Sequence, residues 1–340
     1  MEFALLSLGD HLPDPSTGRL ELTQAGRHRQ IVELGVQAEE CGFDAVWLGE
    51  HHFCDYILTV PQIVLAAIGE RTKRIRLGTG LTLLPHHDAV RIAEDIATLD
   101  CLTAGRAEVC VGVGIDPNCY TFFGQDIRDA KEMLEEKVVL LRRLWTEDKV
   151  DWSGKYRSAL NGVTLTPKPM QLGHPPIWYG GGSSMESVTR AARLGLPILL
   201  PGIFLPPEKF VPLVEVYRAK WREFGHPPEQ MRVGTVTHAH IRDDGADIPA
   251  YWAPYFTAYH AWLCDFTGRE RPPGGFRISP RGPLIFGSPA QAAERICQYR
   301  ELLDLDLLVC VFDSAGLPAS VARRSAELFG TRVIPAVRAA

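Results

Sequence analysis

The stretch IRLGTGLTLLPHHDAVRIAEDIATLDCLTAGRAEVCVGVG (Ile75 to Gly114) decides the fold class, because it has the pattern of strand, helix and strand in succession. Two short apolar runs, Ile75 to Leu83 and Ala107 to Gly114, flank a helix-period pattern from Asp88 to Leu102. Parallel strands need a crossover connection, which is usually a helix, and their sheet is covered on both faces. The stretch therefore predicts a βαβ unit in a parallel sheet.

The same alternation continues along nearly the whole chain. The predicted strands are Phe3 to Leu8, Ala45 to Gly49, Ile75 to Leu83, Ala107 to Gly114, Pro176 to Gly181, Pro197 to Leu200, Arg232 to Ile241 and Leu305 to Phe312. The predicted helices are Gln30 to Cys41, Ile63 to Arg71, Asp88 to Leu102, Arg128 to Trp145, Met185 to Leu194, Glu208 to Phe224, Pro289 to Leu303 and Pro318 to Phe329. Strict alternation of this length predicts a single (β/α)8 TIM barrel over residues 1–340, and a doubly wound open sheet is the alternative.

Residues at the helix ends support these boundaries. Gly42 and Gly195 follow predicted helices, where a left-handed residue commonly ends the helix. Ser288 and Pro289 have the residue types of an N-cap and a first helical position.

Two segments do not fit the repeat and are predicted insertions. Residues 147–173 contain VDWSGKYRSA, which suggests a hairpin. Residues 243–287, here called the lid segment, are rich first in aromatic residues and then in Pro and Gly. Because the lid segment follows the seventh predicted strand on the catalytic side of a barrel, we expect it to cover the active site. Its aromatic side chains could line a pocket or pack in the core.

Composition limits the possible functions. The 340 residues are 46% hydrophobic and 23% charged, with a formal net charge of −5 and no run of Lys and Arg suited to nucleic acid. We expect a cytoplasmic protein without a membrane span, because no signal peptide begins the chain and prolines interrupt its most apolar run. Its eight cysteines include no C-x-x-C pair.

The second predicted strand ends in Glu50, His51 and His52. Consecutive residues leaving a strand point to opposite faces, so the two histidines are poorly placed to share a metal ion, and no metal is expected. A single imidazole directed into the barrel mouth suits proton transfer near neutral pH, and His51 is the candidate. No G-x-S-x-G elbow indicates nucleophilic catalysis.

Glycines gather at the other predicted strand ends. Gly78, Gly80, Gly112, Gly114 and Gly180 would let a flat ligand lie against bare backbone. The run GGGSSMES (Gly180 to Ser187) leads from a strand into a helix, whose N-terminus could bind one phosphate. A glycine-rich turn capped by Ser183 or Ser184 is the structural alternative.

Four segments together resemble the bacterial luciferase-like flavin monooxygenase family. They are AEECGFDAVWLGEHHF (Ala38 to Phe53), the stretch from Ile75 to Gly114, PPIWYGGGSSMESVTRAARLGLPI (Pro175 to Ile198) and GSPAQAAERICQYRELLDLDLLVCVF (Gly287 to Phe312). The resemblance implies a (β/α)8 barrel that uses reduced FMN from a separate flavin reductase, acting transiently or by diffusion. It further implies that O2 forms a flavin 4a-hydroperoxide, which oxygenates a small organic substrate. A homodimer is implied as well.

The resemblance also assigns roles to residues of this chain. His51 matches the histidine that assists the flavin chemistry, and Gly80 with Leu81 matches a non-proline cis peptide beneath the flavin ring. Gly181, Gly182, Ser183 and Ser184 match the phosphate-binding turn. The lid segment matches the mobile loop that shields the active site from water.

Two positions depart from the family pattern. Val113 stands where the luciferase catalytic subunit has a phosphate-binding arginine, and Lys131 stands at a second arginine position. We expect Lys131 to bind the phosphate as a point charge. These departures leave a deazaflavin-dependent oxidoreductase as an alternative, together with a non-catalytic flavin-binding subunit. The EHHF form of residues 50–53 favours FMN.

Overall fold

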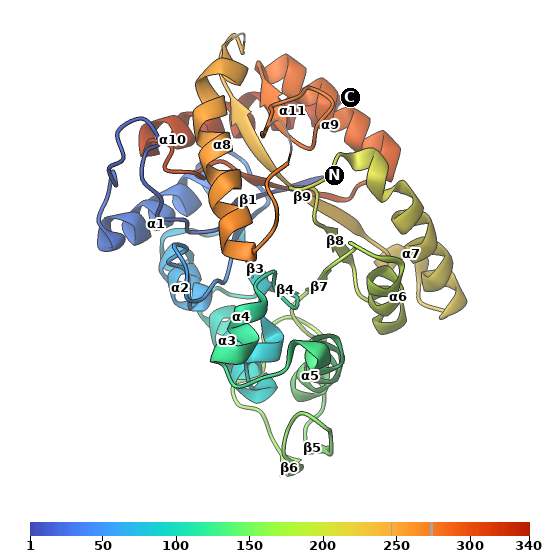
Figure 1. Cartoon of the computed structure of the whole chain (residues 1–340). Coiled ribbons are helices and arrows are strands. Elements are labelled where there is room, and N and C mark those ends of the chain that lie inside the picture. The colour runs from blue at the N-terminus through green and yellow to red at the C-terminus, as the bar shows by residue number, and fades with distance from the viewer. Residues whose placement is uncertain (246, 273–274) are drawn as a thin grey trace.

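The computed structural model describes residues 1–245, 247–272 and 275–340. Eight parallel strands stand in the order β9-β11-β1-β2-β3-β4-β7-β8, and β8 pairs with β9 to close the ring. Helices surround this ring (Figure 1). The TIM barrel predicted from the alternating pattern is confirmed, and the open doubly wound sheet is excluded by the pairing of β8 with β9.

The barrel strands lie close to the predicted runs. Their bounds are β1 Glu2–Ser7, β2 Ala45–Leu48, β3 Arg76–Thr82, β4 Ala107–Val111, β7 Ile177–Gly180, β8 Ile198–Leu200, β9 Val233–Ile241 and β11 Leu307–Val311. Three short strands lie outside this ring, β5 Val150–Trp152, β6 Leu160–Val163 and β10 Ile285–Gly287.

The α-helices include all eight predicted ones. Their bounds are α1 Gln24–Glu40, α2 Pro61–Arg71, α3 Ala89–Leu102, α4 Pro117–Phe122, α5 Ala130–Thr146, α6 Met185–Leu194, α7 Val211–Glu223, α8 Ile248–Thr267, α9 Pro289–Leu303, α10 Ala319–Leu328 and α11 Ile334–Ala339. The 3-10 turns are Leu84–His86, Ile127–Asp129, Pro207–Phe210 and Pro228–Gln230, and a π-helical turn spans Phe329–Val333. Within the described residues, none of the helices combines the length and apolar composition needed to cross a bilayer.

Alternation along the strands divides the core into two layers, as β2 illustrates. Val46 and Leu48 point outward into the layer between the ring and its helices. Ala45 and Trp47 point inward, where Trp47 packs edge-on against Trp178 at 6.1 Å between ring centroids. Both faces of the strand are therefore buried, which accounts for its continuous apolar sequence.

Side-chain caps account for several helix ends. Asp88 caps α3 by accepting a hydrogen bond from the Val90 amide, and Ser288 forms a capping box with Gln291 at the start of α9. Gly195 ends α6 in the left-handed conformation, as predicted. Helix α1 begins earlier than predicted because Thr23 caps it by accepting a hydrogen bond from the Gly26 amide, although its polar first turns lack an apolar period.

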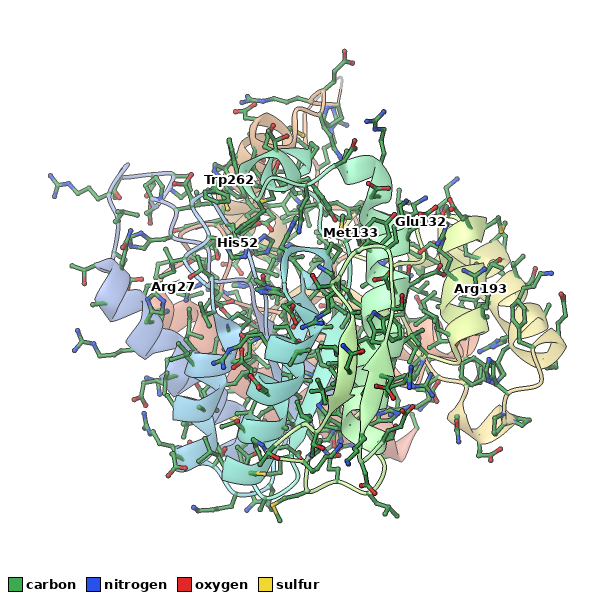
Figure 2. The ribbon with its side chains drawn as sticks, turned by 90° about the horizontal axis from the view of Figure 1, so that it is seen from below. Arg27, His52, Glu132, Met133, Arg193 and Trp262 are labelled. Atoms are coloured by element: carbon green, nitrogen blue, oxygen red, sulfur yellow. The ribbon has the colours of Figure 1, made fainter. Side chains whose placement is uncertain are left out.

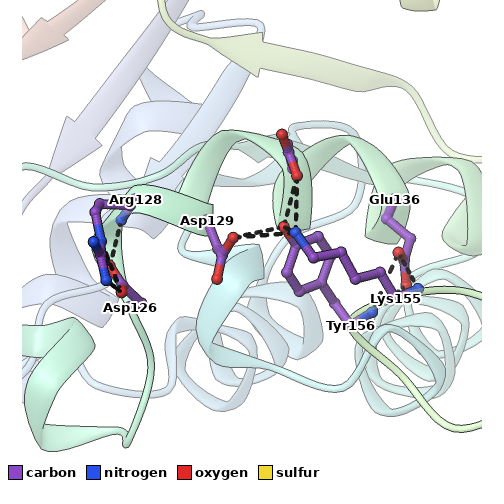
Figure 3. A network of polar contacts seen from close by, with 7 residues as sticks. Asp126, Arg128, Asp129, Glu136, Lys155 and Tyr156 are labelled. Carbon is purple, nitrogen blue, oxygen red and sulfur yellow. Dashed lines mark hydrogen bonds and ion pairs between the residues drawn. The ribbon is translucent and has the colours of Figure 1, made fainter.

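The first insertion contains the predicted hairpin, formed by β5 and β6. Its turn is anchored to the start of α5 (Figure 3). The Tyr156 hydroxyl shares its one proton between Asp129 at 2.9 Å and Glu132 at 2.8 Å. Glu136 accepts the backbone N–H groups of Lys155 and Tyr156. The hairpin therefore lies on the outside of the barrel.

The lid segment forms helix α8 and strand β10, which extends the sheet by pairing with β9. Residues 246, 273 and 274 of the predicted lid lie outside the described residues. Trp252, Phe256 and Tyr259 on α8 are buried in the inner layer of the core. Aromatic packing thus holds α8 against the barrel. Figure 1 shows the course of this helix across the barrel.

Candidate active site

A cavity of about 400 Å³ opens at the carboxyl ends of the barrel strands. Of the predicted site residues, His51, Gly80, Leu81, Gly181 and Ser183 line it. Its apolar wall is formed by Leu6, Leu8, Leu83, Val113, Ile115, Leu199, Leu200, Ile203, Phe204, Val236, Leu263 and Phe266. The barrel topology therefore brings together strand ends that are far apart in the sequence, as expected for a TIM barrel.

Glu50 is the centre of a polar clamp at one side of the cavity. Its Oε1 accepts hydrogen bonds from Nε2 of His52 at 2.8 Å and Nε2 of His87 at 2.6 Å. Its Oε2 accepts the Leu83 amide at 3.1 Å. Burial by itself would raise the pKa of Glu50, but these hydrogen bonds outweigh it and lower the pKa to about 2. Glu50 is therefore ionised, and its hydrogen bonds connect the end of β2 to the segment that follows β3.

These three side chains also have the ligand types of a metal site. Donor atoms of Glu50, His52 and His87 lie within 4.8 Å of one another. The separations of 2.6 and 2.8 Å between carboxylate oxygen and imidazole nitrogen are ordinary charge-assisted hydrogen-bond lengths, which leave the clamp satisfied without an ion. The absence of a metal stays a prediction.

His51 has no hydrogen bond to this clamp among the described residues. Its ring lies against that of Tyr56, with 4.1 Å between centroids, while its backbone N–H donates to Leu58 at 2.9 Å. Loss of hydration lowers the pKa of His51 to about 4. The negative charge of Glu50 raises this pKa but does not outweigh the burial. The imidazole is therefore neutral near pH 7, with one ring nitrogen that can donate a hydrogen bond and one that can accept a proton.

The peptide bond between Gly80 and Leu81 is cis, as the resemblance implies. The glycines around it also have a role within the protein, and the expected contact with a flat ligand stays a prediction. A Cβ atom at Gly112 or Gly180 would lie 2.5 or 2.2 Å from the Leu81 side chain, so these glycines make room for Leu81. Gly78 similarly makes room for Trp47. The absence of a Cβ at these glycines is therefore needed for the packing of Leu81 and Trp47, whether or not a ligand is bound.

The turn after β7 is organised as a helix start. Gly182 donates its N–H to Ser187 Oγ at 3.0 Å, and Ser184 caps α6 by accepting the Ser187 amide at 3.2 Å. In the part of the chain that the structure describes, the backbone N–H groups of Ser183 and Ser184 donate to no acceptor. Two free donors at the N-terminus of a helix suit an anion.

Lys131 does not line the cavity. Its ammonium group pairs with Glu186 at 2.6 Å on the outer side of the turn, where both side chains are about half exposed. Glu186 also pairs with Arg190 at 2.9 Å. The charge of Lys131 is therefore engaged within the protein, and its predicted contact with a phosphate stays a prediction.

Helix α8 closes the cavity from above. The hydroxyl oxygens of Tyr259 on α8 and Tyr56 after β2 lie 2.6 Å apart, and both tyrosines line the cavity. Trp262 packs edge-on against Tyr56 at 4.8 Å. Figure 2 shows Trp262 and His52 at the same end of the molecule.

Sequence reasoning missed several residues that shape the site. Tyr56 had no local signal, and Tyr259 was covered only by the general expectation that aromatic residues of the lid segment could line a pocket. Their contact joins segments 203 residues apart. The consecutive histidines His86 and His87 both shape the site, because His86 lines the cavity and His87 bonds to Glu50, and only their place after β3 could have indicated them. Lys137 on α5 holds the His87 segment by donating to the carbonyls of Pro85 at 2.6 Å and His87 at 2.7 Å.

Residues 1–305 match the family model of the luciferase-like monooxygenases. The chain belongs to this family. This luciferase-like chain is 30% identical over 207 residues to the alkanal monooxygenase alpha chain of Photorhabdus laumondii subsp. laumondii, covering 61% of this chain and 57% of that relative. It is 25% identical over 232 residues to the oxygenase component of the flavin-dependent trigonelline monooxygenase of Acinetobacter baylyi, with coverages of 66% and 62%. These matches span less than two thirds of either relative.

Solved structures match the luciferase-like chain over nearly its full length. Monooxygenase RslO1 from Streptomyces bottropensis has a TM-score of 0.87 and 25% identity, covering 98% of this chain and 99% of that one. Two others at 18% identity, each covering 98% of both chains, show the fold alone. They are the oxygenating constituent of 3,6-diketocamphane monooxygenase of Pseudomonas putida in complex with FMN, with a TM-score of 0.77, and the coenzyme F420-dependent tetrahydromethanopterin reductase of Methanopyrus kandleri, with 0.72.

Proposed function

We propose that this protein is the oxygenase component of a two-component flavin-dependent monooxygenase, which uses reduced FMN and O2 to oxygenate a small organic substrate. The observation that carries the proposal is the neutral imidazole of His51 on the wall of a cavity that also contains Ser183 at the start of α6. Family membership supports the same reaction class.

The residues fit a flavin phosphate and ring. The free N–H groups of Ser183 and Ser184 would bind the phosphate at the start of α6, with Gly181 and Gly182 supplying the turn. Leu81, which also lines the cavity, would support the ring. Bound reduced FMN would supply the electrons and the carbon that reacts with O2.

His51 would handle the proton that the oxygenation requires. Its neutral ring can accept a proton at one nitrogen while the other nitrogen donates a hydrogen bond. The clamp of Glu50, His52 and His87 would keep the neighbouring strand ends in place. Helix α8 would exclude water, because Tyr259, Leu263 and Phe266 close the cavity.

The partners follow from the same proposal. The trigonelline relative is an oxygenase component, which supports a separate flavin reductase here. A homodimer also belongs to the proposal. A non-catalytic flavin-binding subunit is less well supported, because His51 lines the cavity.

A deazaflavin-dependent oxidoreductase is the second candidate. Val113 lines the cavity without a charge, and Lys131 pairs with Glu186, so the expected phosphate cations are absent or engaged. An F420-dependent reductase has the same fold. This alternative would transfer a hydride without O2.

One experiment separates these functions. The purified protein is titrated anaerobically with reduced FMN, and its absorbance is then followed after O2 is added. We expect binding, followed by a transient spectrum that differs from that of free oxidised FMN. Immediate oxidation at the rate of free FMN, or binding of a deazaflavin without O2 uptake, would exclude the monooxygenase. An excess of free reduced FMN mixed with buffer is the control.

A further inference from the structure

The cavity contains one fixed positive charge among its described lining residues, that of Arg269. The acidic side chains on its wall are engaged elsewhere. Glu50 accepts its clamp of hydrogen bonds, and Asp116 caps α4 by accepting the Asn118 amide at 2.9 Å while accepting from Cys119 Sγ at 3.2 Å. Neither carboxylate forms an ion pair with Arg269 among the described residues.

The lid segment positions Arg269 at the end of the face of α8 that closes the cavity. Tyr259, Leu263 and Phe266 line this face at helical spacing. Gly268 then ends the helix in the left-handed conformation, and the Arg269 N–H bonds to the Cys264 carbonyl at 2.9 Å. This C-terminal turn directs the chain back toward the cavity mouth.

The Arg269 guanidinium lies over the Phe204 ring, 5.4 Å from its centroid. Stacking on an aromatic face orients a guanidinium while leaving the edge that carries its N–H groups free. In the described part of the chain Arg269 has no ion-pair partner, whereas the nearby Arg271 pairs with Asp265 at 2.6 Å. Arg269 is thus held at the mouth with its donors unused.

Phe204 follows β8, and the turn from Gly181 to Ser184 follows β7. These strands pair, so the two loops are neighbours on the barrel rim. Arg269 therefore adds a positive side chain from the lid segment to the rim that carries the free backbone N–H groups of Ser183 and Ser184.

We propose that Arg269 binds the oxyanion of a ligand held in this cavity. A planar guanidinium matches the two oxygens of a phosphate or carboxylate. The oxyanion has two possible sources, the phosphate of the flavin or a carboxylate of the substrate. If the oxyanion is the flavin phosphate, the proposal rests on the proposed function. In either case a charged group of the ligand would contact the lid segment.

Binding measurements on matched variants test the proposal. The variants are Arg269→Gln, which removes the charge, Arg269→Lys, which keeps it as a point charge, and Arg271→Gln as a control on the same segment outside the cavity wall. Anaerobic titrations compare reduced FMN with reduced riboflavin, which differs in lacking the phosphate. A second series titrates benzoate and its neutral methyl ester into protein with and without flavin.

A phosphate contact predicts that Arg269→Gln weakens FMN binding by about tenfold, with riboflavin unchanged and Arg269→Lys intermediate. If Arg269 instead contacts a carboxylate, Arg269→Gln should leave both flavin affinities unchanged. It should weaken benzoate binding by about tenfold without affecting the methyl ester. Arg271→Gln should match the unaltered protein in both series.

Equal weakening of FMN and riboflavin would overturn the proposal, because it would indicate lost packing on Phe204. Agreement of Arg269→Gln with the unaltered protein in every titration would also overturn it. Failure of the unaltered protein to bind either flavin would instead contradict the proposed function, and the flavin-free benzoate series would then decide the role of Arg269.

Discussion

The hydroxyl oxygens of Tyr56 and Tyr259 lie 2.6 Å apart, and this contact joins the lid helix to the loop that follows His51. Both side chains are almost completely buried. Burial raises the pKa of both hydroxyls, so both are protonated at neutral pH. One hydroxyl donates to the other, and the accepting hydroxyl keeps its own proton for the cavity.

Tyr259→Phe should loosen the lid helix without unfolding the barrel. The variant loses one buried hydrogen bond, worth about 1 kcal/mol. We expect faster hydrogen exchange across α8 while the barrel strands keep their protection. Tyr255→Phe is the matched control, because its hydroxyl bonds to Asp14 at 3.0 Å and lies one helical turn before Tyr259, outside the cavity wall. Equal effects of the two variants on residues 259–267 would contradict a specific role for Tyr259.

His51→Ala should leave the fold intact and remove proton handling. The expected loss of oxygenated product per reduced flavin is about 10²- to 10⁴-fold, as is typical for lost acid–base catalysis. Hydrogen peroxide released after O2 is added to the reduced complex provides a measurement that needs no substrate, and we expect it to change with the variant. His28→Ala is the control, since His28 is a partly exposed residue of α1 that lies outside the cavity wall and bonds to the Gln24 carbonyl. Unchanged product formation in His51→Ala would refute the assignment.

Removal of metal ions should have no effect on the protein. The clamp of Glu50, His52 and His87 is complete through its hydrogen bonds, so dialysis against a chelator should leave flavin binding and turnover unchanged. Glu50→Gln should lower the unfolding temperature, because in either orientation the amide NH2 would face a donor, the Leu83 N–H or the two imidazole N–H groups. Activity that is lost on chelation and restored by one divalent metal would show that the clamp is a metal site.

Stability should fall as the pH is lowered from about 6.5 toward about 4. Burial lowers the pKa values of His51, His240 and His260 to about 4 and that of His238 to about 3. The unfolded chain therefore binds more protons in this window, which favours unfolding. Asp10 acts in the opposite direction, because burial raises its pKa to about 6. Four histidines outweigh one carboxyl, and urea midpoints measured across this pH range would check the slope.

His240→Phe should stabilise the protein and reduce that slope. Both ring nitrogens of His240 are buried without a partner among the described residues, while the ring stacks on Trp252 at 5.2 Å. Phenylalanine would keep the stack and remove two unsatisfied polar atoms, a gain of about 1 kcal/mol that grows at acid pH. Thermal unfolding at two pH values gives the comparison, and a lower unfolding temperature for the variant at both would contradict it.

The alternation of apolar strands and helical patterns was sufficient to predict the barrel, because each βαβ unit is specified locally by periodicity and by caps such as Asp88 and Ser288. The placement of His51 at a strand end, and with it on the cavity wall, followed from the same local pattern. The cis peptide between Gly80 and Leu81 required the family resemblance, since no propensity in the residues themselves indicates it.

Tertiary structure alone decided which side chains meet. Glu50 bonds to His87 across 37 residues, and Tyr56 bonds to Tyr259 across 203, distances over which local periodicity carries no information. Barrel closure sets these contacts by placing strand ends around one rim. The same closure leaves Lys131 paired with Glu186 outside the cavity and places Arg269 on its wall. The sequence thus determined the scaffold and the position of His51, and only the folded ring decided which charges face the ligand.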